Sequence, residues 1–255
     1  MAGSASRANE ISDSLRDEIL RGQYRAGERL PSERDLATRF DTNRGAIREA
    51  LKKLEQLGIA EVRPGGARVA PVAEASLDVV GHLLDLQTPP DLNIVNQVLQ
   101  VGSVVMSAWA RLAVENGSDD ELAAILASVA RIREASDAPT RRQATIDFGF
   151  ELIGATKNMV AGLVHRGLLN QLVERLPRMN LHPDLDRKRF ARSARDLEHS
   201  FDKRDSAAAA EAVYQMIEVL HQGVREALLA ALETHKPQAE GIDHAIQSVG
   251  AGSSR

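Results

Sequence analysis

Four basic side chains between residues 44 and 53 have the spacing of a helix that reads nucleic acid. Arg44 and Arg48 are four residues apart, and Lys52 and Lys53 follow one turn later. Because helical neighbours recur every three to four residues, these side chains gather on the outer side of a helix, away from its apolar stripe. That stripe consists of Ile47, Leu51 and Leu54. Such a helix fits the major groove of DNA, and an arginine near its first turn can make a two-pronged contact with guanine.

Small residues beside Arg44 would allow this helix to approach base edges closely. Gly45 and Ala46 have little or no side chain, and Asn43 can reach an adenine edge or a phosphate. Arg48, one turn further on, suits a phosphate or a second base. Together these residues form a predicted recognition surface.

A glycine-rich hairpin follows the basic helix. Residues 59–63 and 67–70 can form two short strands that are joined by a tight turn. Gly65 and Gly66 would let the hairpin tip enter the narrow minor groove, and Arg68 would be attracted by the negative potential there. We therefore interpret the hairpin as the wing of a DNA-binding domain.

Shorter elements that precede the basic helix would hold it in place. Ser32 is a good N-cap for a helix on which Leu36 and Phe40 share one face. The polar residues 41–43 suit the tight turn between two crossed helices. An earlier apolar stripe predicts one more helix, packed behind these two, and comprises Ile11, Leu15, Ile19 and Leu20. This order of elements predicts a winged helix-turn-helix.

Asp147 and Glu151 are a second pair of side chains whose spacing could support chemistry. They are four residues apart, so a helix would place both carboxylates on one face, where they could share acid–base catalysis. The chain has no cysteine, and we find no motif for a nucleophile or a phosphate-binding loop. We therefore expect a binding protein and not an enzyme.

Charge is distributed unevenly along the chain. The net charge is −4, but residues 1–71 carry 13 Lys and Arg against 11 Asp and Glu, whereas the remainder carries 19 against 25. The N-terminal part is therefore mildly basic, in agreement with a DNA-binding role. No apolar run has the length of a membrane span, so we expect a cytoplasmic protein without membrane association.

The pattern of the whole chain predicts a mainly α fold with two domains. We expect a disordered tail at 1–9, the winged helix-turn-helix domain at 10–71 and a linker at 72–76. Residues 77–234 should form an all-α helical bundle of about six or seven helices, which would bind an effector and dimerise. A flexible tail is expected at 235–255.

The N-terminal motifs resemble the signature of the GntR superfamily of bacterial regulators. The similar segments read LPSERDLA from Leu30, NRGAIREALKKLEQLGIA from Asn43 and RPGGARV from Arg63. The resemblance implies that three arginines contact DNA, namely Arg34, Arg44 and Arg48. It also places the variable recognition positions at Asn43, Gly45 and Ala46, and the wing-tip glycine at Gly65. One departure is Asp41, which replaces a glycine of the family and costs the turn some conformational freedom.

The order of the later helices resembles the effector domain of the FadR branch of this superfamily. Regulators of that branch are dimers in which a small ligand changes the spacing of the DNA-reading domains. A separate argument also favours a homodimer. One winged domain contacts too few base pairs to distinguish its site from competing sites in a genome. A two-fold symmetric dimer contacts twice as many base pairs on a palindromic operator. The apolar segments 79–86 and 95–105 are candidates for the interface, and we expect a repressor.

Many members of the branch resemble one another in an aspartate and three histidines that hold a divalent metal. By this resemblance Asp147 is the aspartate, but Glu151 stands where a histidine is expected. The later ligand positions fall near Ala194 and Met216, which do not supply ligands for zinc or nickel. We therefore expect no metal and no other cofactor.

The expected effector pocket is apolar, because the arginine that holds the effector in relatives aligns with Gly102. The segment from Asp147 to Asn158 resembles that of acyl-CoA-binding regulators, so an acyl-CoA or a fatty acid is the leading expectation for the effector. The residues expected to bind it are Val98, Gly102, Trp109, Asp147, Phe150, Glu151 and Tyr214. Two alternatives stay open, a metal-dependent carboxylate-sensing regulator of the same superfamily and a ligand-free architectural DNA binder.

Overall fold

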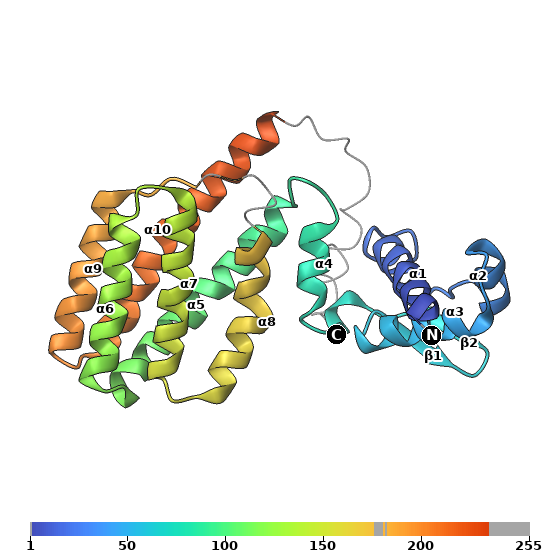
Figure 1. The fold of residues 1–255 in the computed structure, drawn as a ribbon, viewed down its shortest axis with the longest axis horizontal. Helices are drawn as coiled ribbons and strands as arrows, with labels where there is room; N and C mark the ends of the chain where they lie inside the picture. Colours follow the sequence, from blue (N-terminus) through green and yellow to red (C-terminus); the bar gives the residue numbers. More distant parts are fainter. Residues whose placement is uncertain (1, 176–180, 182, 235–255) are drawn as a thin grey trace, which may run out of the picture. The chain divides into compact units, whose positions relative to one another are not determined.

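The structure, a computed structural model, describes residues 2–175, 181 and 183–234, which divide into two compact units (Figure 1). We call residues 2–86 the winged unit and the described residues from 87 to 234 the helical unit. Each unit buries its own hydrophobic core, as expected of a domain. The predicted tail at 235–255 lies outside the described residues.

The winged unit contains three helices followed by an antiparallel hairpin, which confirms the predicted winged helix-turn-helix. In the hairpin, Ala60 pairs with Val69 and Arg63 pairs with Gly66. The elements are α1 (Ala2–Leu20), α2 (Glu33–Arg39), α3 (Arg44–Gln56), β1 (Ala60–Arg63) and β2 (Gly66–Val69).

The first helix is longer than the sequence pattern indicated. Its start at Ala2 places a helix over most of the tail that we expected to be disordered. The reason is that the apolar stripe continues towards the N-terminus, because Ala8 is buried with Ile11 and Leu15 at helical spacing.

A side-chain cap begins each helix of the helix-turn-helix, Ser32 at α2 and Asn43 at α3. Ser32 Oγ accepts a hydrogen bond from the backbone N of Asp35 at 3.2 Å, and Asn43 Oδ1 accepts one from Ala46 N at 3.0 Å. Between the two helices Asp41 has a φ of 46°, in the left-handed region that favours glycine. The substitution of aspartate for the family's glycine therefore falls at a position where glycine would be less strained.

The boundary between the two units lies further along the chain than the predicted linker at 72–76. That segment forms a short 3-10 helix, η1 (Val72–Glu74), and Ser76 N donates a hydrogen bond to Leu57 O at 2.9 Å. It leads to α4 (Val79–Asp85), which we had assigned to the helical bundle. The structure places α4 in the winged unit because Val79 and Leu86 are buried in that unit's core.

The helical unit consists of six helices within the part of the chain that the structure describes. Ser118 and Glu121 form a reciprocal capping box at the start of one of them. The helices are α5 (Leu92–Asn116), α6 (Asp119–Glu134), α7 (Ala138–Ala155), α8 (Met159–Arg175), α9 (Arg187–Asp202) and α10 (Ser206–Thr234).

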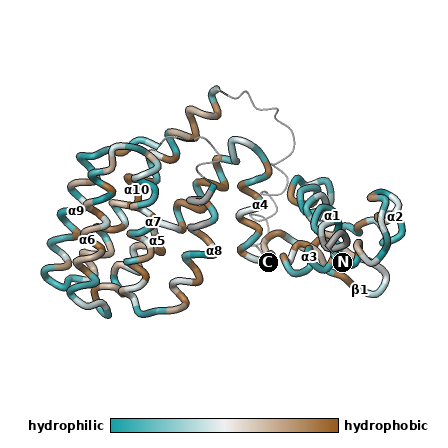
Figure 2. The backbone as a smooth tube through the Cα atoms, in the orientation of Figure 1, coloured by the Kyte–Doolittle hydropathy of each residue, from teal (hydrophilic) through white to brown (hydrophobic). Residues whose placement is uncertain are grey.

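One hydrophobic core joins these helices. Phe148 of α7 and Phe190 of α9 are its largest fully buried side chains, and Met216 of α10 is also fully buried. α10 packs against α5 and α9, and α6 packs against α7. Figure 2 shows in brown the hydrophobic residues along these helices. Among the described residues, no helix is both long enough and apolar enough to cross a bilayer.

Candidate DNA-binding surface and ligand cavity

The outer face of α3 carries a stripe of exposed cations. Arg44, Arg48 and Lys52 follow one another at intervals of four residues and are exposed, while Ile47, Leu51 and Leu54 bury the opposite face. Arg44 forms no hydrogen bond or ion pair with any residue that the structure describes. A cation without an internal partner at the first turn of an exposed helix is available for an external anion or a base edge.

A second arginine of the stripe is held by a carboxylate. Arg48 Nε lies 2.9 Å from Glu33 Oε2 at the start of α2, and the Arg48 side chain is 64% exposed. Arg34, one residue further along α2, is 78% exposed and lies 3.6 Å from Asp35. The structure therefore gathers the predicted Arg34, Arg44 and Arg48 on two helices that pack against each other.

The residues beside Arg44 have structural roles at the start of α3 that the sequence did not indicate. The side chain of Asn43 caps α3, and a Cβ at Gly45 would lie 2.9 Å from its Oδ1, so glycine is the residue that fits beside this cap. Ala46 is only 2% exposed, because it packs into the core of the winged unit. Ala46, which we expected at a recognition position on the surface, therefore lies inside the core of the winged unit. Gly45 remains exposed at the helix start.

The wing tip consists of the two predicted glycines. Gly65 and Gly66 have φ values of 102° and 130°, which side chains rarely adopt, and a Cβ at Gly65 would meet nothing within 4 Å. The tip is therefore slim and open. Arg68 is exposed on β2, but its Nη1 donates a hydrogen bond to Gly27 O at 2.9 Å.

Arg29 is a residue of the wing that the sequence reasoning missed. The segment 27–30 runs beside β2 and forms an isolated β-bridge between Arg29 and Arg68, with hydrogen bonds from Leu30 N to Ala67 O and from Val69 N to Glu28 O, both of 2.9 Å. From this segment the guanidinium of Arg29 donates a hydrogen bond to Gly65 O and packs against Gly66. Arg29 thereby holds the wing tip. No spacing signal in the sequence connects residue 29 with residue 65.

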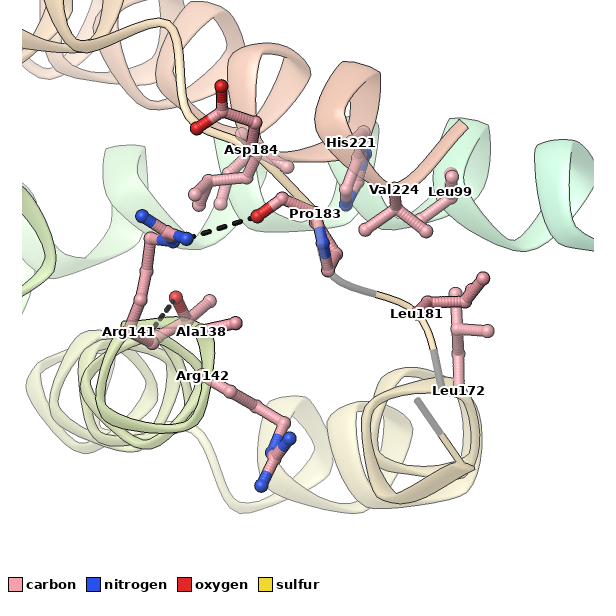
Figure 3. A pocket seen from close by; sticks show the side chains of 13 residues that line it. Leu99, Ala138, Arg141, Arg142, Leu172, Leu181, Pro183, Asp184, His221 and Val224 are labelled. Carbon is pink, nitrogen blue, oxygen red and sulfur yellow. Dashed lines mark hydrogen bonds between the residues drawn. The ribbon is translucent and has the colours of Figure 1, made fainter. Parts of the chain in front are cut away.

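The helical unit encloses a cavity between α5, α7, α8 and α10 (Figure 3). Its volume is about 120 Å³. Its apolar wall is formed by Leu99, Leu172, Leu181, Ile217, Leu220 and Val224. Arg141, Arg142 and Thr145 of α7 and His221 of α10 add polar groups. The cavity is thus mostly hydrophobic with a few polar side chains, which is the usual composition of a small-molecule site.

Behind the cavity wall, His221 belongs to a hydrogen-bonded cluster. Its Nδ1 lies 2.9 Å from Ser103 Oγ, and Ser103 donates its hydroxyl proton to Glu218. Arg225 donates to the second oxygen of Glu218 at 3.2 Å. Interaction with His221, followed by the hydrogen bonds from Ser103 and Arg225, lowers the pKa of Glu218 to about 2. Burial lowers the pKa of His221 in spite of the nearby carboxylate, so this imidazole is neutral at pH 7.

None of the seven residues expected to bind an effector lines this cavity. Val98 and Gly102 are buried on α5, and Tyr214 is half-buried on α10. Trp109 and Phe150 both pack edge-on against His165, each with a ring-centre separation of 5.5 Å. The cavity residues were missed because they come from four helices and a loop that are distant in sequence.

Asp147 and Glu151 face α6 and not the cavity. Glu151 accepts hydrogen bonds from Ser128 and from Arg131, the latter at 3.2 Å. Asp147 accepts one from Gln143 at 2.9 Å and lines a separate, shallow hollow beside Arg131.

The residues present do not fit the metal that the family resemblance implies. Ala194 and Met216 are buried in the core, where they supply no ligand for zinc or nickel. Across residues 2–175, 181 and 183–234 the structure gathers no group of three or more His, Asp or Glu side chains that could hold an ion.

Comparison with known proteins connects both units to one family. Residues 7–69 match the family of bacterial regulatory proteins described as the gntR family, and residues 97–219 match the FCD domain. The HTH-type transcriptional repressor NanR of Salmonella newport (strain SL254) is 28% identical over 172 residues, which cover 66% of this chain and 65% of that protein.

Two further relatives are transcriptional regulators by name. One HTH-type transcriptional regulator of Mycobacterium tuberculosis (strain ATCC 25618 / H37Rv) is 31% identical over 157 residues, which cover 61% of this chain and 64% of that protein. The match thus spans just under two thirds of that relative's length. The Uxu operon transcriptional regulator of Escherichia coli (strain K12) is 28% identical over 231 residues, which cover 85% of this chain and 86% of that protein.

A winged helix-turn-helix that matches the gntR description places this chain in the GntR family of bacterial regulatory proteins. More narrowly, the FCD domain that follows the DNA-binding domain makes it a member of the FadR-like subfamily of GntR regulators. Because these relatives are regulators, family membership confirms the prediction that the chain is not an enzyme.

Proposed function

We propose that this protein is a sequence-specific DNA-binding transcriptional repressor that acts in the cytoplasm as a homodimer and responds to a small molecule. The observation that carries the DNA-binding part is the exposed stripe on α3, which begins at the unpartnered Arg44. Repression is supported by the name of one relative, the repressor NanR.

The proposal gives each part of the winged unit a different task. α3 enters the major groove, where Arg44 reads a base and Arg48 exchanges Glu33 for a phosphate. Arg34 of α2 contacts the backbone of the same half-site. The slim tip at Gly65 and Gly66 approaches the minor groove, and the negative potential of the groove attracts Arg68.

An exposed apolar face on α8 supports the homodimer. Met159, Val160, Leu163 and Val164 are 80%, 58%, 62% and 38% exposed, and their spacing places them on neighbouring positions of one helix. α8 packs beside α5, on which Val101 and Val104 are also exposed. An apolar surface of this kind marks an interaction site in a protein that is otherwise soluble. We therefore place the subunit interface here, and not on the segment 79–86, whose Val79 and Leu84 are buried.

An effector with a hydrocarbon portion, an acyl-CoA or a fatty acid, would occupy the cavity of the helical unit. Such a ligand weakens operator binding only if it binds more tightly to the conformer that cannot bind DNA. The neutral His221 and the apolar wall favour a largely hydrophobic ligand over a metal-held one. The cavity also argues against a purely architectural DNA binder, which has no need of it.

The test begins with selection of an operator from random DNA by the full chain. Its affinity for Arg44→Ala is then measured by fluorescence anisotropy, and Arg192→Ala, an exposed arginine of α9, serves as the matched control. We expect Arg44→Ala to weaken operator binding by about tenfold to a hundredfold, since a good two-pronged contact contributes roughly 1–3 kcal/mol. Unchanged affinity in Arg44→Ala, or an equal loss in Arg192→Ala, would contradict the proposal.

A further inference from the structure

We infer that Arg7 of α1 is a positioning residue for DNA recognition, which binds the end of α2 and keeps the turn before α3 in the conformation that presents Arg44. Arg7 acts through this turn and contacts neither a base nor a phosphate. It lies within the stretch 1–9, which we had expected to be disordered and which belongs to α1 from Ala2 onwards. The inference rests on the proposed function, because it explains how the winged unit holds its recognition helix.

The turn between α2 and α3 depends on one residue in the left-handed conformation. That residue is Asp41, with a φ of 46°. Thr42 N donates a hydrogen bond to Ala37 O at 3.0 Å, and the N of Asp41 donates one to Thr38 O at 3.4 Å. These two bonds form the Schellman pattern, in which glycine most often occupies the left-handed position. Because Asp41 has a side chain, the turn is less stable than it would be with glycine.

The hydrogen bonds of this turn leave the carbonyl of Phe40 unpaired. The last four carbonyls of a helix lack an intrahelical donor, and the Schellman pattern satisfies only the earlier ones. Phe40 is the C-cap of α2, and its O accepts a hydrogen bond from Nη2 of Arg7, 33 residues earlier in the chain. The guanidinium also lies at the negative end of the helix dipole. Arg7 therefore stabilises the end of α2 just before the left-handed residue.

Ion pairs orient Arg7 and join α1 to α2 a second time. Arg7 Nη1 lies 2.8 Å from Glu10 Oε2, one turn further along α1. Arg39, the last residue of α2, donates from Nη1 to Glu18 Oε2 at 2.9 Å and from Nη2 to the other oxygen of this carboxylate. α1 also packs against α3. Because the link between Arg39 and Glu18 remains when Arg7 is replaced, we expect a partial loss of DNA binding.

The experiment is a double-mutant cycle between Arg7→Met and Asp41→Gly in the full chain. Affinity for the operator selected from random DNA is measured by fluorescence anisotropy over a series of salt concentrations. Methionine removes the donors of Arg7 and keeps a long side chain, whereas glycine at residue 41 relieves the turn. Arg16→Met is the matched control, because Arg16 pairs only with Asp13 and Asp17 of its own helix among the described residues.

We expect Arg7→Met to weaken operator binding by about fivefold, the effect of about one hydrogen bond, with an unchanged dependence of affinity on salt. In the Asp41→Gly background the same substitution should weaken binding by less than about twofold, because glycine adopts the left-handed conformation without support. Arg16→Met should bind as wild type does. Circular dichroism should show every variant folded at the assay temperature, so a lower global stability alone would not change the affinity.

Unchanged affinity in Arg7→Met, or an equal loss in both backgrounds, would overturn the inference. A slope of affinity against salt concentration that falls by about 0.9 would also overturn it, since Arg7 would then contact a phosphate.

Amide hydrogen exchange without DNA separates this inference from the proposed function. Arg7→Met should accelerate exchange at the amides of Asp41 and Thr42, whose hydrogen bonds close the turn, and leave the amides of α3 as in wild type. If the protein selects no operator, the proposed function fails, and accelerated exchange at these two amides still supports the role of Arg7 in the turn. Unchanged exchange at both amides would contradict that role.

Discussion

The two units of this protein use arginine in opposite ways. In the winged unit, Arg44 and Arg48 project from an exposed helix, and the apolar residues of that helix all face inwards. In the helical unit, Arg141 and Arg142 line a mostly apolar cavity between four helices, together with Leu181, Pro183 and Asp184. The first arrangement suits a large, rigid polyanion that approaches from outside, and the second suits a small molecule that binds inside the cavity. Charge that is spread over a surface and charge at the mouth of a cavity therefore predict different classes of ligand.

The largest expected effect is on stability, and it tests whether the two units unfold independently. Phe148 is fully buried in the core of the helical unit, and Phe148→Ala should lower the free energy of unfolding of that unit by about 3–5 kcal/mol. Amide hydrogen exchange in α3 should remain as in wild type, because Phe148 belongs to the core of the helical unit and the winged unit buries a core of its own. Equal acceleration of exchange in α3 and α7 would show that the two cores unfold as one.

A second prediction concerns the buried imidazole of His165. His165 is 5% exposed, and neither ring nitrogen has a hydrogen-bond partner in the described structure. Burial lowers the pKa of His165 to about 4. The unfolded chain therefore takes up a proton near pH 6.5, and the folded chain does so only near pH 4. The titration of His165 therefore leaves the free energy of unfolding unchanged above about pH 6.5 and lowers it as the pH decreases from there towards about 4.

At pH 5 the titration of His165 lowers the free energy of unfolding by about 2 kcal/mol relative to pH 7.5, and His165→Leu should abolish this difference. Thermal melts at both pH values check this, with His199→Leu on the exposed face of α9 as the control. The account of His165 would be wrong if its substitution left the pH dependence of the melting temperature unchanged.

A third prediction separates wing positioning from direct DNA contact. Removal of the Arg29 guanidinium in Arg29→Ala frees the Gly65 carbonyl and should weaken operator binding by about fivefold, equivalent to one hydrogen bond of roughly 1 kcal/mol. The salt dependence of the affinity should stay constant, since a lost phosphate contact would reduce its slope by about 0.9. Arg25→Ala, an exposed neighbour, is the control. A reduced slope of affinity against salt concentration would show that Arg29 contacts a phosphate and does not act only by holding the wing tip.

The smallest effect concerns the ion pair between Glu33 of α2 and Arg48 of α3. Glu33→Gln should release Arg48 for DNA and tighten operator binding by about twofold to threefold, since an exposed pair contributes roughly 0.2–1 kcal/mol. Glu49→Gln removes the same charge next to Lys52, whose Nζ lies 2.9 Å away, and serves as the control. If both variants tighten binding equally, the cause is net charge and not the release of Arg48.

How far the sequence predicts these features depends on how local they are. The recognition helix and the wing lie within residues 43–69, so spacing and turn residues were sufficient to predict them. The cavity unites Leu99 with Val224, and no local pattern connects such positions. Burial of Ala46 and the packing of α4 on the winged unit were also missed, because both depend on contacts between elements.

The central claim is that Arg44 reads a base in each half-site of a palindromic operator, and a double-mutant cycle tests it most directly. Operator affinity is measured by anisotropy for wild type and Arg44→Ala, each on the selected operator and on operators with one guanine pair replaced in both half-sites. The account predicts one guanine whose replacement weakens wild type by about tenfold or more, yet leaves Arg44→Ala unaffected. If Arg44→Ala discriminates every base pair as strongly as wild type does, Arg44 reads no base and the account is contradicted.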